Sequence, residues 1–281
     1  MDKKLKDLRE AYKNVPIPKE LDEIILKTIP QKKRKKHLFM WPVAAAAAAL
    51  LLTATVNFSP DVANAMSKVP IMKGIVEVLT FNELNEAANN TSITIKTPAI
   101  SGLDNKALEN SVNEKYLEES KKLYKEFAAA DKNEHLAINS DFEIITDTPE
   151  LLSISRSTEI TQASGYVQNH YVVIDKENEL LITLKSLFKN DQYITVISEN
   201  IKEQMRQQME ADPNKIYFIS EDEMEPFTQI NPDQQFYISP NHKLTIAFDE
   251  YEVAPGYMGT VAFEIPTDIV SDILVGDKYL H

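Results

Sequence analysis

Cysteine is absent from this chain and glycine is scarce, and each absence excludes a kind of chemistry. None of the 281 residues is cysteine, which rules out disulfide bridges, thiolate catalysis and cysteine-ligated zinc. Six glycines leave almost no material for a glycine-rich phosphate-binding loop. No two of the histidines stand at metal-ligand or catalytic spacing; they are His37, His135, His170, His242 and His281. We therefore expect no metal ion and no cofactor.

Basic side chains are also in the minority, and they are unevenly distributed. The chain has 30 Lys+Arg against 43 Asp+Glu, a net charge of −13. An acidic protein is a poor candidate for binding nucleic acid, because the phosphate backbone carries the same sign of charge. Residues 1–37 nevertheless contain 12 basic and 6 acidic side chains, whereas residues 38–281 contain 18 and 37. The boundary between the two compositions coincides with a long uncharged run.

This uncharged run is long enough to cross a membrane. Residues 38–60 are 23 consecutive positions without an ionisable side chain, including six alanines at 44–49. About 20 apolar residues span a bilayer as a helix, and we predict a transmembrane signal-anchor helix over 38–58. Five consecutive basic residues at 32–36 precede it, so the positive-inside rule places the N-terminus in the cytoplasm. The chain is then a single-pass type II protein of the cell membrane. The alternative is a buried alanine-rich helix of a soluble protein.

A candidate cleavage site follows the predicted span. Ala63 and Ala65 are small residues at alternate positions just beyond the helix-breaking Pro60, an order typical of secretory signals. A cut after Ala65 would leave Met66 as the first residue. The segment is either an anchor that stays in the membrane or one that stays until the site becomes accessible. We assign residues 59–90 to this site and a juxtamembrane linker.

The short cytoplasmic part, residues 1–37, has two apolar stripes at helical spacing. Pro16 ends the first predicted helix, and Pro18 suits the first turn of the second. Helices this short cannot bury their stripes well against each other, so we expect a partner protein to cover them. The alternative is a frayed tail beside the membrane. The stripe residues are Leu5, Leu8, Tyr12, Leu21, Ile24 and Ile25.

The outer part, residues 91–281, is predicted to be an α+β domain with a mainly antiparallel sheet flanked by helices. Periodicity indicates helices over 104–130, 191–211 and 267–275. It indicates strands over 91–97, 141–147, 151–160, 166–175, 179–184, 215–219, 234–239, 243–252 and 257–265. Carboxylate pairs occur, as expected by chance among so many acidic residues, and an enzyme is not supported.

Several segments identify a family. Residues 248–259 (FDEYEVAPGYMG) resemble the strand–turn–strand hallmark of the DUF3298-type module found in bacterial anti-sigma factors and cell-wall polysaccharide deacetylases. Residues 95–103 and 200–209 fit the same module and its N-terminal companion. With residues 8–14, residues 17–21 and the single span, the whole chain resembles the membrane-anchored, lysozyme-sensing anti-sigma-V factors. The deacetylase catalytic domain is missing, as is the zinc-binding His/Cys motif of many anti-sigma factors.

The resemblance implies a membrane-spanning negative regulator. Its cytoplasmic helices would hold an extracytoplasmic-function sigma factor inactive, and its outer domain would bind lysozyme. Lysozyme binding would then permit cleavage by signal peptidase, followed by a site-2 intramembrane protease that completes release. The net charge of the outer part also suits a basic ligand, although it would equally suit solubility. The alternative function is an anchored module that binds cell-wall glycan without signalling.

We expect the lysozyme-binding residues on two turns. Pro255 and Gly256 are predicted to form a rigid type II turn, with Gly256 at the position of positive φ, in a hairpin that displays Tyr257. Ser164 and Gly165 belong to a second turn that could lie at the same end of the sheet. Nearby acids at 249, 250 and 252 would contribute electrostatic steering. The alternative is that Tyr257 packs on its own sheet and the Pro-Gly pair is only a turn.

Overall fold

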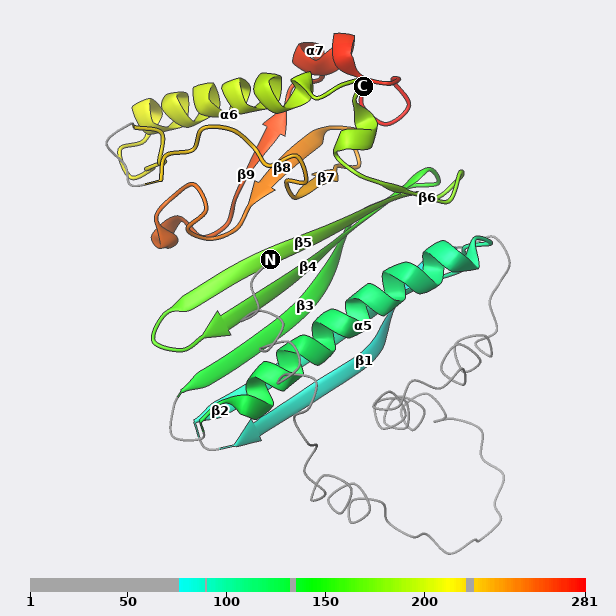
Figure 1. Ribbon diagram of the computed structural model, residues 1–281, viewed down its shortest axis with the longest axis vertical. Helices are drawn as coiled ribbons and strands as arrows, with labels where there is room; N and C mark the ends of the chain where they lie inside the picture. The colour runs from blue at the N-terminus through cyan, green and yellow to red at the C-terminus, as the bar shows by residue number, and fades with distance from the viewer. Residues whose placement is uncertain (1–75, 89, 132–134, 221–224) are drawn as a thin grey trace, which may run out of the picture. The chain divides into compact units, whose positions relative to one another are not determined.

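The computed structural model describes residues 76–281 except 89, 132–134 and 221–224. Within these ranges the chain is an α+β structure rich in antiparallel strands, as predicted, although the strands form two sheets (Figure 1). The strands are β1 (Glu77–Ala88), β2 (Thr91–Ser101), β3 (Leu136–Asp147), β4 (Leu151–Thr161), β5 (Gly165–Asp175), β6 (Leu180–Ile182), β7 (Phe236–Ile238), β8 (Leu244–Phe248) and β9 (Val261–Ile265). The helices are α5 (Lys106–Ala129), α6 (Gln192–Ala211) and α7 (Thr267–Val270), with 3-10 turns η1 (Lys185–Leu187), η2 (Gly256–Met258) and η3 (Ser271–Ile273).

The larger sheet has six strands in the order β1-β2-β3-β4-β5-β6. Its neighbouring strands are antiparallel apart from β2 and β3, which run parallel. A parallel pair needs a long crossover connection, and α5 provides it between β2 and β3. Helix α5 lies across one face of this sheet (Figure 1).

Strand β1 occupies residues 77–88, within the range 59–90 that we assigned to the linker. It pairs with β2 along its whole length. Its sequence, EVLTFNELNEAA, contains several good helix formers and shows no clean alternation, so local preference does not predict a strand. Pairing with the largely buried strand β2 accounts for its extended conformation.

Polar side chains fix α5 on the sheet. Asn113 both accepts from the backbone N–H of Ile100 and donates to its carbonyl, each at 2.8 Å. Arg156 on β4 is 1% exposed and donates to the Tyr116 carbonyl, to Ser120 Oγ and to a carboxylate oxygen of Glu119. A buried guanidinium is tolerated only when its donors are satisfied in this way.

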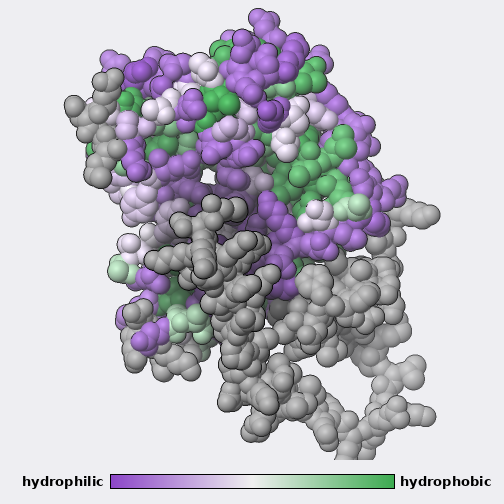
Figure 2. Space-filling view, in the orientation of Figure 1, coloured by the Kyte–Doolittle hydropathy of each residue, from purple (hydrophilic) through white to green (hydrophobic). Residues whose placement is uncertain are grey.

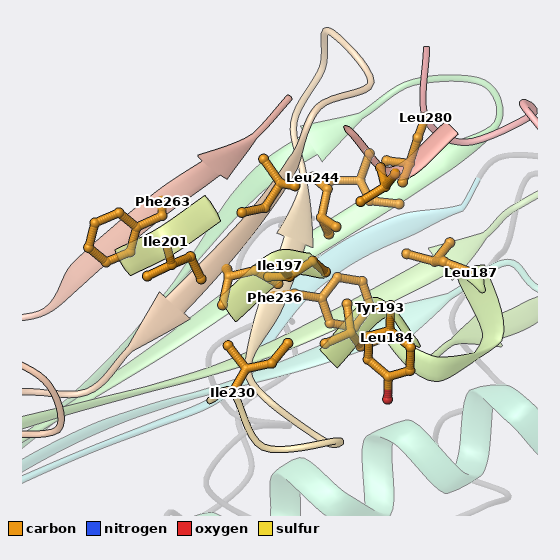
Figure 3. Close-up of a cluster of buried hydrophobic side chains, with 14 of the residues drawn as sticks. Leu184, Leu187, Tyr193, Ile197, Ile201, Ile230, Phe236, Leu244, Phe263 and Leu280 are labelled. Carbon is orange, nitrogen blue, oxygen red and sulfur yellow. The ribbon is translucent and has the colours of Figure 1, made fainter. Parts of the chain in front are cut away.

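The smaller sheet, in the order β7-β8-β9, carries α6 and the larger hydrophobic core. Tyr193, Ile197 and Ile201 recur along one side of α6 and pack with residues of the smaller sheet such as Phe236 and Phe263 (Figure 3). The spacing of these α6 residues is that of an amphipathic helix, as the sequence predicted.

Strands β4 and β5 contribute to both cores. Leu152 and Ile154 lie in the core beneath α5, whereas Leu151 lies in the core of the smaller sheet. Between them, Ser153 donates from Oγ to the carbonyl of Ile238 on β7 at 2.9 Å, and Thr146 of β3 donates to the same carbonyl at 2.7 Å. These bonds join the two sheets.

A buried carboxylate at the end of β5 binds the last residues of the chain. Asp175 is 0% exposed and accepts hydrogen bonds from Asn178, from Lys278 Nζ at 2.9 Å and from Tyr279 Oη at 2.5 Å. Burial alone would raise the pKa of Asp175, but the hydrogen bonds from Tyr279, Asn178 and Lys278 together hold that pKa well below its usual range. The folded state therefore favours the ionised carboxylate.

Several predicted elements are wrong in extent or kind. The strand predicted over 257–265 begins only at Val261, and the strand predicted over 141–147 begins at Leu136. Residues 215–219 form no strand; the Phe218 N–H donates instead to the carbonyl of Val253 in a loop. The strand predicted over 243–252 ends at Phe248, because the next residues turn toward β5. The helix predicted over 267–275 is only the single turn α7, followed by η3.

We predict that Asp175→Asn lowers the free energy of unfolding by about 2 kcal/mol at neutral pH, the range for a buried hydrogen-bonded charge. Because the folded-state pKa of Asp175 is depressed, its contribution is present above the unfolded value near 3.8. That contribution declines as pH falls below this value toward the folded-state pKa. Denaturant unfolding at pH 7 and pH 3 should therefore show a larger difference from wild type at pH 7.

Asp233→Asn, which alters an exposed carboxylate, is the matched control and should change stability little at either pH. A difference for Asp175→Asn that is equal at the two pH values would contradict the charged network.

Candidate functional site

The structure brings the two predicted turns close together. Gly165 opens β5 opposite Thr161, and the intervening turn 162–164 is closed by a bond from the Gln162 N–H to the Ser164 carbonyl. The second segment is the loop 249–260, which connects the antiparallel strands β8 and β9. The loop lies beside the start of β5, because the Glu250 N–H donates to the Val167 carbonyl at 3.2 Å.

The Pro-Gly pair has a different conformation from the predicted type II turn. Pro255 is extended, with φ −60° and ψ 148°, and Gly256 begins the 3-10 turn η2. The left-handed backbone positions of the loop are Gly259, with φ 64°, and Tyr251, with φ 68°. The turn η2, closed by bonds from the Met258 N–H to the Pro255 carbonyl and from the Gly259 N–H to the Gly256 carbonyl, stands in place of the predicted type II turn.

The ring of Tyr251 lies over Gly256, so a larger residue at this position would displace that side chain. A Cβ at this position would overlap the ring of Tyr251, which covers the glycine. The same ring is stacked on Tyr166 of β5, with 6.4 Å between ring centroids. Tyr251 thus links its own loop, 249–260, to the start of β5, because its ring contacts Tyr166 on one side and Gly256 on the other.

Tyr257 is displayed to solvent instead of packing on its own sheet. Its side chain is 66% exposed, the highest value among the large hydrophobic side chains of the described residues. Its hydroxyl donates to the carbonyl of Asn214 at 2.9 Å, which restrains the tip of the ring. Figure 2 shows a face that is mostly hydrophilic with a hydrophobic patch. Among the exposed large hydrophobic residues in the described part of the chain, only Tyr251 and Tyr257 are aromatic.

We use the name tyrosine surface for Tyr166, Tyr251 and Tyr257 together with Ser164 and Pro255. Ser164 and Tyr251 are exposed, and Tyr166 and Pro255 are partly so. Tyrosine loses little side-chain entropy on binding and presents both apolar area and a hydroxyl.

The hydroxyl of Tyr166 lies in an acidic environment. Burial raises the pKa of Tyr166, and the nearby carboxylates of Asp249, Glu252 and Glu250 raise this pKa further. A hydrogen bond from Gln168 acts in the opposite direction and lowers it.

Sequence reasoning proposed Ser164, Gly165, Pro255, Gly256 and Tyr257 as site residues. It did not include Tyr251 or Tyr166, which the structure places beside them. The signal available for Tyr251 was its place in the segment 248–259 that carries the family resemblance. Its contact with Tyr166 joins residues 85 positions apart, and no local pattern reports such a contact.

The remaining predicted sites lie outside the described residues. These are the cytoplasmic stripes at 5, 8, 12, 21, 24 and 25, the span 38–58 and the cleavage site at 63, 65 and 66. In the described part of the chain, no helix is both long and apolar enough to cross a membrane. The same part contains no cluster of three or more potential metal ligands.

Two family models match different parts of the described chain. Residues 185–268, which span α6 and the smaller sheet, match the family described as "Protein of unknown function (DUF3298)". Residues 84–160, which lie mostly in the larger sheet and α5, match the family described as "Deacetylase PdaC". A solved DUF3298 family protein from Bacteroides fragilis NCTC 9343 superposes with a TM-score of 0.51 at 16% identity, covering 72% of this chain and 94% of that one. This likeness supports the fold alone.

A curated relative is similar over the entire chain. The anti-sigma-V factor RsiV of Bacillus subtilis (strain 168) is 59% identical over 285 residues, covering 100% of both chains. That relative is a regulatory protein and not an enzyme, in agreement with the expectation from sequence, and an anti-sigma factor implies a sigma factor as partner. The chain belongs to the RsiV family of anti-sigma-V factors.

Proposed function

We propose that this anti-sigma factor is a membrane-anchored receptor for lysozyme that releases its sigma factor by regulated proteolysis. Residues 1–37 hold a V-type extracytoplasmic-function sigma factor at the cytoplasmic face, and 38–58 anchor the chain with its C-terminal domain outside. Lysozyme binds the outer domain, signal peptidase cuts after Ala65, and a site-2 intramembrane protease completes release.

The observation that carries the receptor role is the tyrosine surface. Its two loops contact each other through Tyr166 and Tyr251, and such contacts reduce the conformational entropy that binding would cost. Aromatic side chains on ordered loops are typical of the residues that dominate protein–protein binding energies. The excess of acidic residues in 38–281, 37 against 18 basic, favours encounter with a basic protein such as lysozyme.

A second function, binding of cell-wall glycan without signalling, has one observation in its favour. Part of the domain matches a family described as a deacetylase, and exposed tyrosines also suit the apolar faces of sugar rings. The two stripes in residues 1–37 favour the signalling role, because a wall anchor has no need of them. Copurification of a sigma factor with the intact chain decides between the two functions.

Cleavage tests the proposed signal. We predict that Ala65→Trp leaves the chain full-length when lysozyme is added to cells, because signal peptidase accepts only small side chains at this position. Immunoblotting of wild type should show a shortened product under the same conditions. The control Ser67→Trp, just beyond the proposed cut, should still be shortened. Normal shortening of Ala65→Trp would exclude this cleavage site.

The sigma-factor contact is tested by charge reversal in the stripes. We predict that Leu8→Asp or Ile24→Asp raises expression from a sigma-dependent reporter at least tenfold without lysozyme, because a buried carboxylate in an apolar interface is strongly unfavourable. Lys3→Asp, outside the stripes, is the control for charge alone. Full repression by both stripe variants would favour the frayed-tail alternative.

The receptor surface is tested by truncating its most exposed ring. We predict that Tyr257→Ala, alone or with Pro255→Ala, weakens lysozyme binding by full-length protein in nanodiscs at least tenfold, about 1.4 kcal/mol. The melting temperature should change little, because the ring is mostly exposed. Tyr257→Phe keeps the ring and should retain most of the affinity. Val275→Ala removes a comparably exposed apolar side chain elsewhere and should have no effect. Unchanged affinity in Tyr257→Ala, or loss accompanied by unfolding, would contradict the assignment.

A further inference from the structure

Among the described residues, no strand pairs with one edge of β5 over most of its length. Strand β4 pairs with β5 from Gly165 to Asp175, but on the other side β6 reaches only residues 173–175. Alternate backbone N–H groups of residues 165–171 therefore point away from the sheet. An open edge of this kind must be satisfied or protected.

Three side chains from residues 235–250, next to and following strands β7 and β8, accept hydrogen bonds from this edge. Glu250 Oε2 accepts from the Val167 N–H at 3.0 Å, and Asp249 Oδ1 accepts from the Asn169 N–H at 2.8 Å. Gln235 Oε1 accepts from the Tyr171 N–H at 2.9 Å. The acceptors meet every second residue of β5, which is the period of the groups that a paired strand would satisfy.

The backbone completes this arrangement at Glu250. Its N–H donates to the Val167 carbonyl while its carboxylate accepts from the Val167 N–H, so one residue satisfies both groups of its partner. The neighbouring Asp249 is fixed in turn, because its N–H donates to Glu252 Oε2 at 2.8 Å and Glu252 Oε1 accepts from Gln234. Asp249 and Glu250 are both partly buried, which strengthens such bonds.

Tyr251 is the next residue in the chain, so the hydrogen bonds of Asp249 and Glu250 also fix the position of its backbone. Its unusual φ of 68° directs the ring between Tyr166 and Gly256, and Gly256 is adjacent to Tyr257. The two carboxylates thus anchor the loop whose exposed rings form the tyrosine surface. Our sequence analysis gave these acids only a role in electrostatic steering, whereas the structure shows that oxygens of Asp249 and Glu250 are directed at backbone N–H groups.

We propose that Asp249 and Glu250 are positioning residues for the tyrosine surface, acting as hydrogen-bond acceptors that replace a missing strand beside β5 and not as charges that attract the partner. The proposal rests on the proposed function for its binding readout. It distinguishes hydrogen bonding from charge, and amide substitutions separate these two properties.

The test compares isosteric variants at position 250 in the full-length chain in nanodiscs. Glu250→Gln keeps an acceptor oxygen and removes the charge, whereas Glu250→Met removes both at similar volume. We expect Glu250→Gln to bind lysozyme within about twofold of wild type and Glu250→Met to bind at least tenfold more weakly, a loss that persists in high salt. Glu159→Gln is the control for charge, because Glu159 is an exposed carboxylate of β4 close to Gly165. It should match the small effect of Glu250→Gln.

A second measurement needs no ligand. Hydrogen exchange at the Val167 amide should accelerate at least tenfold in Glu250→Met and remain near wild type in Glu250→Gln, with the Ile154 amide in the core of β4 as internal reference. If Glu250→Met does not fold, the double variant Asp249→Asn/Glu250→Gln keeps both acceptors and provides the test, with expected affinity within a few-fold of wild type.

Three results would overturn the proposal. One is equal loss of binding in Glu250→Gln and Glu250→Met that disappears at high salt, which would assign the role to charge. Another is unchanged binding in Glu250→Met. The third is a tenfold loss in the double amide variant. If wild type does not bind lysozyme at all, the proposed function fails, while hydrogen exchange still tests the acceptors on β5.

Discussion

Strands β4 and β5 belong to both hydrophobic cores, and this double use constrains the rest of the structure. Successive side chains of a strand point to opposite faces, so Leu151 and Leu152 lie in different cores. A register slip of one residue would exchange the two sets. The position of the smaller sheet, and with it the loop 249–260, depends on this register, because Ser153 of β4 also bonds the β7 carbonyl.

Sequence patterns predicted the elements in which apolar residues recur with a strong helical period. They failed where contacts with distant residues determine the local conformation. Helices α5 and α6 follow from apolar residues at helical spacing, and their ends lie within two residues of the prediction. Strand β1 has the composition of a helix, and only its pairing with β2 makes it a strand. Residues 215–219 alternate like a strand, but the Tyr217 N–H meets the sulfur of Met209 and no strand partner.

The candidate site shows the same division between local and distant causes. Turn residues and an exposed tyrosine could be recognised from the segment 248–259. The 3-10 turn at Gly256 and the position of the Tyr251 ring over this glycine could not be predicted, because no local pattern reports either. The acids of this segment were interpreted only as steering charges, since nothing in the sequence reports that β6 covers only three residues of β5.

The hydrogen bonds from the last residues of the chain to Asp175 also have a consequence for the order of folding during synthesis. Lys278 and Tyr279 lie 103 and 104 positions after the carboxylate that they bind. Leu280, next in the chain, packs in the hydrophobic core of the smaller sheet. A nascent chain that has produced β5 therefore carries a carboxylate that it cannot yet bury at low cost. The larger sheet, to which β5 belongs, remains incompletely stabilised until translation reaches these residues. The domain is thus biased toward folding late and as one unit, which keeps the partly made chain open while it is still being produced.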